Sequence, residues 1–245
     1  MLKKLLEKKV KPHHLELQLE HGAATHIGGR DINADSFTVN QKKKLFIVAD
    51  GVGDRLGKLA SWFACHTVGY SFKPTNPKTL LAAALKAHEK LQAAEPNWKL
   101  DQDEHSAGMP VTTLTALHFG KNNTGHFVHA GDSSIYRFRN GSLDRLTTPK
   151  NPSLQPIGGQ RKTKPQVKTI EVRQGDVFLL CTDGVTGNEV NPYLQAKRDE
   201  EIKKVLLKTA SGEKSPKETA QHLATRYLTD FSDSRTAIVV KVKTR

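Results

Sequence analysis

The sequence predicts an α+β protein with mainly antiparallel sheets, and three observations carry this prediction. Apolar residues make up 36% and charged residues 26% of the 245 residues, which is typical of a globular protein. Strand-like and helix-like segments come in blocks rather than in strict alternation. Neither an internal repeat nor a linker-like stretch interrupts the chain. We therefore expect a single domain over residues 1–245, with its core at about 15–243 and a basic N-terminal extension at 1–14.

The first half of the chain predicts two strands followed by two helices. From Leu15, LELQLEH alternates apolar and polar residues, as a half-buried strand does. The glycine-rich stretch GGRDINADSF predicts a turn region, and we expect one further strand, which ends in LFIVADGVGDRLG. Residues 57–72 and the stretch PKTLLAAALKAHEKLQAAE show helical spacing of their apolar residues. The polar stretch PNWKLDQDEHSAGMP then predicts a loop.

The second half predicts a β meander and then helices. Turn residues separate the strand-like runs VTTLTALHF, GHFVHAG and SSIYRFRNGSLDRL, which indicates successive hairpins. A loop, TTPKNPSLQPIGGQRKTKPQ, precedes two more strands, VKTIEVR and DVFLLC. Residues from about 199 to 231 are mostly helical in pattern, and SPKETAQHLATRYL has the serine and glutamate of a capping box. The strand TAIVVKV closes the chain.

The charge and the cysteines restrict the partners and the compartment. The formal net charge of +13 favours anionic partners, which could be nucleic acid, an acidic membrane surface or a phosphorylated substrate. Aromatic residues do not alternate with the lysines of KKLLEKK, QKKK and GGQRKTKP, which argues against a nucleic-acid groove. No run of eighteen apolar residues predicts a membrane span. Cys65 and Cys181 form no CxxC pair, so we expect buried thiols and a cytoplasmic location.

Three aspartates recur at the ends of strand-like runs. FIVADG ends at Asp50, FLLCTDG ends at Asp183, and Asp233 comes just before TAIVV. Carboxylates at strand ends can converge at one edge of a sheet, and oxygen-rich clusters suit Mg²⁺ or Mn²⁺. Glycine after the first two aspartates would let a backbone carbonyl approach such an ion. The alternative is that each aspartate simply belongs to a turn, since Asp-Gly is a common turn signal.

Five motifs together resemble those of one known family. GGRDINADSF, LFIVADGVGD, VTTLTAL with HAGDSSIYRFRNG, GDVFLLCTDGV and DSRTAIVV have the order and approximate spacing found in the metal-dependent PPM/PP2C serine/threonine protein phosphatases. The resemblance runs from about His26 to Val242. It implies an α-β-β-α sandwich, in which two central antiparallel sheets are flanked by helix pairs, with two Mn²⁺ or Mg²⁺ ions at one end.

The resemblance also implies roles for individual residues. Asp50 matches the aspartate that bridges the two ions, and Gly51 matches the glycine whose carbonyl binds one of them. Asp183 and Asp233 match the remaining direct carboxylate ligands. Asp35 matches an aspartate that acts through metal-bound water.

Two further positions complete the implied site. Arg30 matches the arginine that grips the substrate phosphate, and Asp132 lies where many members bind a third metal. The alternative for Asp132 is an ordinary turn aspartate. The implied reaction is attack on phosphoserine or phosphothreonine by a hydroxide that bridges the two ions, with Asp50 and Arg30 as the catalytic residues. We expect phosphorylated protein substrates, a cognate Ser/Thr kinase and a monomeric enzyme.

The sequence departs from the family pattern in the same region. Ala34 replaces an acidic residue, Ser134 replaces the usual arginine after GDS, and Asp54 and Arg55 follow DGVG where many members have a histidine as general acid. Loss of a general acid slows expulsion of an alkoxide by ~10²–10⁴-fold. A catalytically weak module that binds a phosphorylated partner through Arg30 therefore remains the alternative.

Overall fold

The structure is a computed structural model that describes residues 17–53, 55–94, 110–148, 155–159, 162–187, 192–225 and 232–243. One five-stranded antiparallel sheet, here called the β12 sheet, has the order β1-β12-β11-β7-β8. Its strands are β1 (Gln18–His26), β12 (Arg235–Lys243), β11 (Val177–Cys181), β7 (Ser134–Arg139) and β8 (Ser142–Arg145).

A second five-stranded antiparallel sheet, the β3 sheet, has the order β10-β6-β5-β3-β2. Its strands are β10 (Gln166–Glu171), β6 (Thr124–Ala130), β5 (Leu114–Phe119), β3 (Leu45–Asp50) and β2 (Asp35–Asn40). A small ladder joins β4 (Val111–Thr112) to β9 (Ile157–Gly158) beside it.

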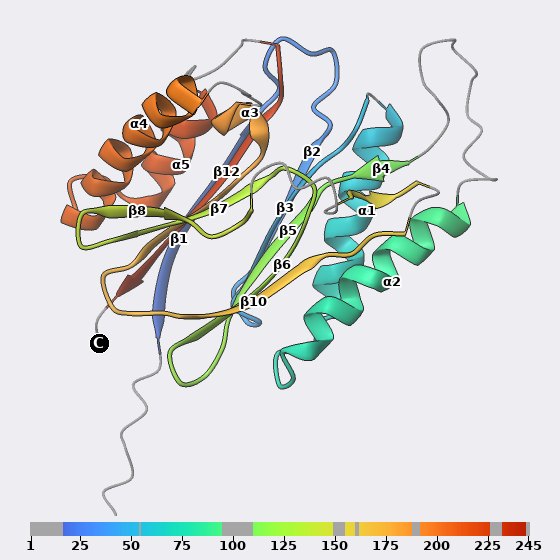
Figure 1. Ribbon diagram of the computed structural model, residues 1–245, viewed down its shortest axis with the longest axis horizontal. Helices are drawn as coiled ribbons and strands as arrows, with labels where there is room; N and C mark the ends of the chain where they lie inside the picture. The colour runs from blue at the N-terminus through green and yellow to red at the C-terminus, as the bar shows by residue number, and fades with distance from the viewer. Residues whose placement is uncertain are drawn as a thin grey trace, which may run out of the picture.

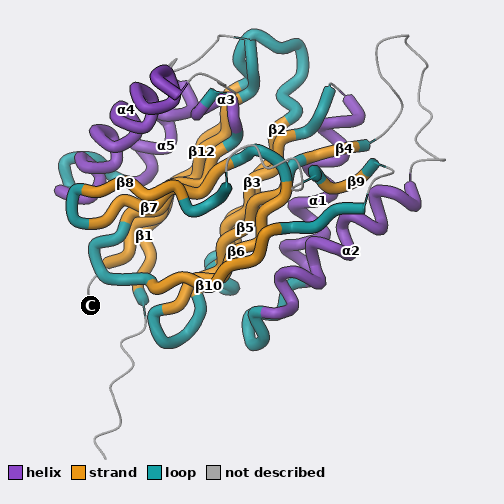
Figure 2. Tube along the Cα trace, in the orientation of Figure 1, coloured by secondary structure: helices purple, strands orange, loops and turns teal. Residues whose placement is uncertain are grey.

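Helices cover the outer face of each sheet. The helices are α1 (Arg55–Ser71), α2 (Lys78–Ala94), the short α3 (Asp183–Thr186), α4 (Pro192–Ser211) and α5 (Pro216–Thr225). Figure 1 shows α1 and α2 on the β3 sheet and α4 and α5 on the β12 sheet, and Figure 2 shows the two sheets between these helix pairs. The predicted α-β-β-α sandwich of two antiparallel sheets flanked by helix pairs is therefore confirmed.

Three apolar layers explain why these strands are continuously apolar. In β3, Leu45, Ile47 and Ala49 pack under α1 and α2, whereas Phe46 and Val48 pack between the sheets. Side chains alternate between the two faces of a strand, so a strand covered on both faces needs apolar residues at every position. A third layer lies between the β12 sheet and the α4–α5 pair. In β3 this covered arrangement leaves the only charged residue, Asp50, at the end of the strand.

Two sequence predictions about the strands were incomplete. The single strand expected before Asp50 is a hairpin, because residues 35–40 pair with β3 after a turn at 41–44. β2 is an edge strand with one partly exposed face, so it carries polar residues. In the sequence these polar residues resemble those of a turn. The expected meander is split: β6 and β7 belong to different sheets, and the chain crosses between them at Gly131, whose φ is 99°.

The helix predictions hold with shifted boundaries. α4 begins at Pro192 rather than near Asp199. The capping box is present, since Ser215 N donates to Glu218 Oε2 (2.8 Å) and Glu218 N donates to Ser215 Oγ (3.2 Å). The loop predicted after α2 lies almost entirely outside the described residues. None of the helices in the described ranges has the length and apolar character that a membrane crossing requires.

Candidate active site

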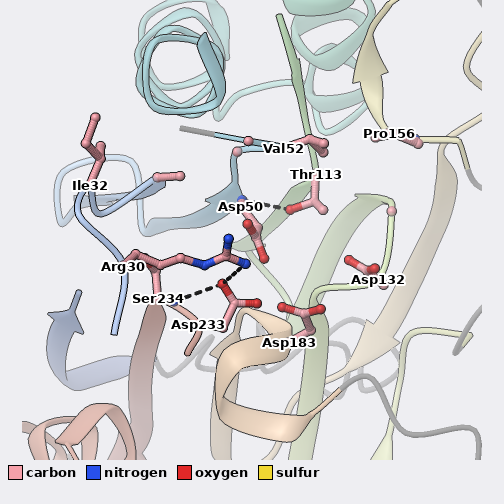
Figure 3. Close-up of a pocket in the computed structure, with 14 residues that line it drawn as sticks. Arg30, Ile32, Asp50, Val52, Thr113, Asp132, Pro156, Asp183, Asp233 and Ser234 are labelled. Carbon is pink, nitrogen blue, oxygen red and sulfur yellow. Dashed lines mark hydrogen bonds and ion pairs between the residues drawn. The ribbon is translucent and has the colours of Figure 1, made fainter. Parts of the chain in front are cut away.

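One cavity of about 260 Å³ collects six of the seven residues singled out from the sequence. Figure 3 shows the side chains of the five predicted residues that it labels around this cavity, and they come from strand ends and adjoining loops of both sheets. The predicted residues on its wall are Arg30, Asp50, Gly51, Asp132, Asp183 and Asp233. The other wall residues are Ile32, Ala34, Val52, Gly53, Thr113, Gly131, Pro156 and Ser234.

Asp50 is the last residue of β3, and neighbouring hydrogen bonds hold its main chain on both sides. Its N–H donates to Thr113 Oγ1 at 2.8 Å. Its carbonyl accepts from Thr113 N and from Thr112 Oγ1, each at 2.8 Å. Because the backbone polar groups of Asp50 are satisfied locally, its carboxylate is left to face the cavity, as Figure 3 shows.

Gly51 lets the main chain pass very close to the start of α1. A Cβ atom at Gly51 would fall on the carbonyl of Gly57, and one at Gly57 would lie 2.6 Å from Val52 O. Gly51 N also donates to Ala34 O (3.3 Å). The two glycines are therefore required for a close backbone contact that brings the Gly51 segment to the cavity wall.

Asp183 approaches from the other sheet, as the first residue of α3, and is separated from β11 by Thr182. Its Oδ1 atom is buried and has no hydrogen-bond partner within the described part of the chain. Burial, followed by the charge of Asp132 on the turn between β6 and β7, raises the pKa of Asp183 to about 6. Asp132 and Asp183 therefore present neighbouring negative charges to one side of the cavity.

Asp233 and Arg30 bind each other in this structure. Arg30 Nη2 lies 3.2 Å from Asp233 Oδ1, and the two side chains are 49% and 38% exposed. The same oxygen accepts from Ser234 N at 3.0 Å (Figure 3). Exposed ion pairs of this kind contribute only about 0–1 kcal/mol, so either partner can exchange readily for a ligand.

Asp35 is the predicted residue that is absent from the cavity wall. It faces Asp50 in the β2–β3 register and is 1% exposed. Thr182 Oγ1 donates to its Oδ2 at 2.8 Å, while its Oδ1 has no hydrogen-bond partner among the described residues. Burial is the largest cause that raises the pKa of Asp35 to about 7, and burial together with Asp35 and Asp183 raises the pKa of Asp50.

This donor set fits hard divalent cations. Burial and mutual repulsion raise the pKa values of these carboxylates, and the Oδ1 atoms of Asp35 and Asp183 have no hydrogen-bond partner among the described residues. A bound divalent cation would neutralise the clustered charge and satisfy these oxygens. Among the described residues no three acidic, His or Cys side chains already stand together as a complete ion site. Asp233 instead turns toward Arg30. Carboxylate and carbonyl oxygens would select Mg²⁺ or Mn²⁺ over softer metals.

Two residues that hold the site in place, Thr113 and Arg235, were not among the predicted site residues. Thr113 Oγ1, which accepts from Asp50, is also hydrogen-bonded to Ser133 Oγ (2.8 Å), so it links β3 to the Asp132 turn. Arg235 is fully buried directly after Ser234; its Nε donates to Ala224 O and its Nη2 to His26 Nδ1, each at 2.9 Å. The available signal was an arginine at the head of the otherwise apolar strand TAIVV.

The departures from the family pattern are visible here too. Ala34 lies on the cavity wall, where no carboxylate replaces the missing one at that position. Arg55 is exposed at the start of α1, and Asp54 lies outside the described residues. No histidine is among the described residues that line the cavity.

Comparisons with known proteins agree with this geometry. Residues 23–225 match the model of the protein phosphatase 2C family. The chain is 30% identical over 170 residues to the serine/threonine protein phosphatase PstP of Mycobacterium tuberculosis, covering 58% of this chain and 32% of the relative. It is 28% identical over 197 residues to the protein phosphatase PhpP of Streptococcus pneumoniae, covering 69% and 79%. The chain thus spans about a third of the length of the first relative.

Solved structures show the same fold. The catalytic domain of PstP in complex with two manganese ions superposes with a TM-score of 0.74 at 25% identity, over 94% of this chain and all of that one. PppA, a regulatory component of the type VI secretion system (T6SS) in Pseudomonas aeruginosa, has a TM-score of 0.74 at 22% identity, over 93% of this chain and 99% of its own.

Proposed function

We propose that this chain, which belongs to the protein phosphatase 2C family, hydrolyses phosphoserine and phosphothreonine in proteins with two bound divalent cations. The observation that carries the proposal is the convergence of carboxylates from both sheets on one cavity that has an arginine at its rim. The printed names of the relatives, which are protein phosphatases, and the two manganese ions of the PstP domain support it.

The proposed ligands follow from the positions around the cavity. Asp50 would be shared by two ions, with the Gly51 carbonyl, Asp183 and Asp233 as the other direct ligands. Asp35, which is buried outside the cavity wall, would contact an ion through a water molecule. Asp132 would bind a third ion. When bound, the Mn²⁺ or Mg²⁺ ions would acidify water and neutralise charge on the phosphoryl group.

The side chains of the protein have separate tasks in this reaction. Arg30 would leave Asp233 and hold the phosphate through its planar guanidinium, which can donate two parallel hydrogen bonds. Because Thr113 fixes the main chain of Asp50, the Asp50 carboxylate would keep the same position from one turnover to the next. Ile32, Val52 and Pro156 offer apolar surface to the phosphorylated side chain.

A metal-dependent assay tests the proposal. We expect Mn²⁺-dependent hydrolysis of p-nitrophenyl phosphate and of a phosphothreonine peptide. Asp50→Ala and Asp183→Asn should lower kcat/KM on the order of 10³-fold, because the shared ligand and a direct ligand are lost. Asp144→Asn is the matched control, because Asp144 is an exposed aspartate that pairs with Arg137 and neither residue lines the cavity. Absence of turnover on both substrates with Mn²⁺ would refute the proposal.

One observation favours the alternative, a weak enzyme that mainly binds a phosphorylated partner through Arg30. No histidine in the described cavity wall can protonate an alkoxide, whereas a nitrophenolate leaves without a proton. Activity on the aryl phosphate with almost none on phosphothreonine would select this alternative. For either function we propose a cognate Ser/Thr kinase and a cytoplasmic location, where the buried thiols of Cys65 and Cys181 stay reduced.

A further inference from the structure

The outward face of α1 is apolar and aromatic where a surface helix normally carries charge. Its exposed positions are Arg55, Leu59, Trp62, His66 and Tyr70, spaced four, three, four and four residues apart. They therefore form one continuous stripe along the helix. Leu59 is 40%, Trp62 55% and Tyr70 81% exposed. Contiguous apolar surface of this kind is typical of a contact site for another molecule.

The stripe is ordered as well as apolar. The rings of Trp62 and His66 stack at 5.4 Å with an interplanar angle of 13°. Ring stacking restrains the indole before any partner arrives, which lowers the entropy lost on binding. Exposed Trp and Tyr are the residues that most often dominate the free energy of protein contacts. We call Leu59, Trp62, His66 and Tyr70 the α1 stripe.

The charged residues of α1 itself are all positive. α1 contains no aspartate or glutamate, and Arg55 and Lys58 lie in its first turn. At its far end a surface pocket is lined by Tyr70 together with three lysines, Lys43, Lys73 and Lys86. Lys43 Nζ donates to the carbonyls of Gly69, Tyr70 and Phe72, which neutralises the negative end of the helix dipole. Lys58 turns inward, since its Nζ donates to Asp35 O at 2.7 Å. An acidic partner would therefore meet positive charge at the two ends of the stripe, from Arg55 at the start of α1 and from Lys73 and Lys86 beside Tyr70.

α1 starts at the rim of the candidate active site, one turn before the α1 stripe. Val52 and Gly53 line the cavity, and α1 begins two residues later, at Arg55. From Arg55 to Tyr70 the helix rises about 22 Å at 1.5 Å per residue. An extended chain covers that distance in about seven residues. A protein segment whose phosphorylated residue occupies the cavity can therefore continue along the stripe.

We propose that the α1 stripe docks an acidic segment of the phosphoprotein substrate, next to its phosphorylated residue. Apolar side chains of that segment lie on Leu59, Trp62 and Tyr70, and its carboxylates face Lys73 and Lys86. This inference rests on the proposed function and names the substrate class, an acidic phosphoprotein with apolar residues beside the phosphorylation site. Trp62 and Tyr70 lie about two and four turns along α1, so a short phosphate ester should end before it reaches them.

Kinetics with long and short substrates test the inference. The probes are serine-phosphorylated casein, a five-residue phosphothreonine peptide and p-nitrophenyl phosphate, each with Mn²⁺. In the double variant Trp62→Ala/Tyr70→Ala we expect the KM for casein to rise about tenfold with kcat unchanged, a loss typical of one or two contact residues. The KM values for the two short substrates should stay constant. Tyr193→Ala on α4, which removes a tyrosine that is 76% exposed, is the matched control.

Two kinetic results would overturn the inference. An unchanged KM for casein in the double variant shows that nothing docks on the stripe, even though the short substrates are hydrolysed and the proposed function stands. An equal loss on all three substrates shows that the substitutions act through the fold rather than through docking.

A binding experiment keeps the inference testable if no substrate is turned over. Trp98→Phe leaves Trp62 as the single tryptophan of the chain. We expect titration with phosphorylated casein to shift the Trp62 emission, and 0.5 M salt to weaken this binding because of its charge component. No shift at low salt contradicts docking. Sedimentation gives the remaining outcome: a dimer that becomes a monomer in Trp62→Ala/Tyr70→Ala would make the stripe a contact between two copies and overturn the proposal.

Discussion

The two halves of the candidate active site hold their carboxylates in different ways. On the β3 side, hydrogen bonds from Thr112 and Thr113 fix the main chain of Asp50, and Gly57 packs directly on the next residue. On the β12 side, Asp233 is partly exposed and is held by Ser234 N and by Arg30. The position of Asp50, the proposed shared ligand, is therefore set by backbone geometry, whereas the pair that would meet the phosphate can rearrange at small cost.

The largest effect should come from filling the glycine contact on the β3 side. In Gly57→Ala the new methyl group meets Gly51 and Val52 main-chain atoms, which cannot move without displacing the cavity wall. We expect a loss of about 3 kcal/mol in the free energy of unfolding and roughly 100-fold in kcat/KM. Urea denaturation and the nitrophenyl phosphate assay measure the two quantities.

A second glycine of the same helix provides the control. At Gly69 a Cβ atom would make only an ordinary contact, 3.5 Å from Thr38 Cγ2. Gly69→Ala should therefore gain up to about 1 kcal/mol from helix propensity. Equal stability of the two variants would contradict the idea that the β3 side depends on a close backbone contact.

The next largest effect on stability concerns the layer between the two sheets, which packs against both sides of the site. His129 on β6 is fully buried, with its Nδ1 bonded to Thr115 Oγ1 at 2.8 Å. Burial, and secondarily the charge of Arg145 from the other sheet, lowers the pKa of His129 to about 4. The unfolded chain binds the extra proton near pH 6.5, so this histidine favours folding above that pH and loses its contribution as the pH falls toward 4.

Between pH 7.5 and pH 5 this histidine alone should cost the wild-type protein about 2 kcal/mol of unfolding free energy. His129→Gln removes the titration, so the difference between variant and wild type should change by that amount over the same range. The carboxylates of the cavity titrate in both proteins and cancel in the comparison. Parallel stability curves would show that His129 is not held neutral in the folded state.

A smaller effect should follow from loosening the link between Asp50 and the Asp132 turn. Thr113→Val keeps the shape of the side chain but removes the acceptor for Asp50 N and the partner of Ser133 Oγ. Two buried polar groups lose a partner, so we expect a loss of about 1.5 kcal/mol in the free energy of unfolding and a tenfold weaker activation by Mn²⁺. Thr113→Ser keeps the hydroxyl and should restore the metal response. A Mn²⁺ titration that is the same for both variants would contradict the positioning role of Thr113.

The parts of this site that the sequence could predict are those carried by local motifs. Asp50, Asp183 and Asp233 each end or precede an apolar run, and such positions are visible from the period of the side chains alone. Thr113 and Gly57 gave no comparable signal, because their importance comes from contacts between segments far apart in the chain. The crossing of β6 to β7 was missed for the same reason: turn residues reveal a reversal of the chain but not the sheet that receives it.

The smallest effect on stability should come from the exposed pair on the β12 side. Arg30→Met removes the ion pair with Asp233 while keeping the length of the side chain. Because both side chains are largely solvated, we expect the free energy of unfolding to change by no more than about 0.5 kcal/mol. The KM for phosphorylated substrates should nevertheless rise at least tenfold, since the guanidinium that would hold the phosphate is lost. A large loss of stability with an unchanged KM would contradict this prediction. It would show that Arg30 stabilises the fold through Asp233 and does not hold the phosphate.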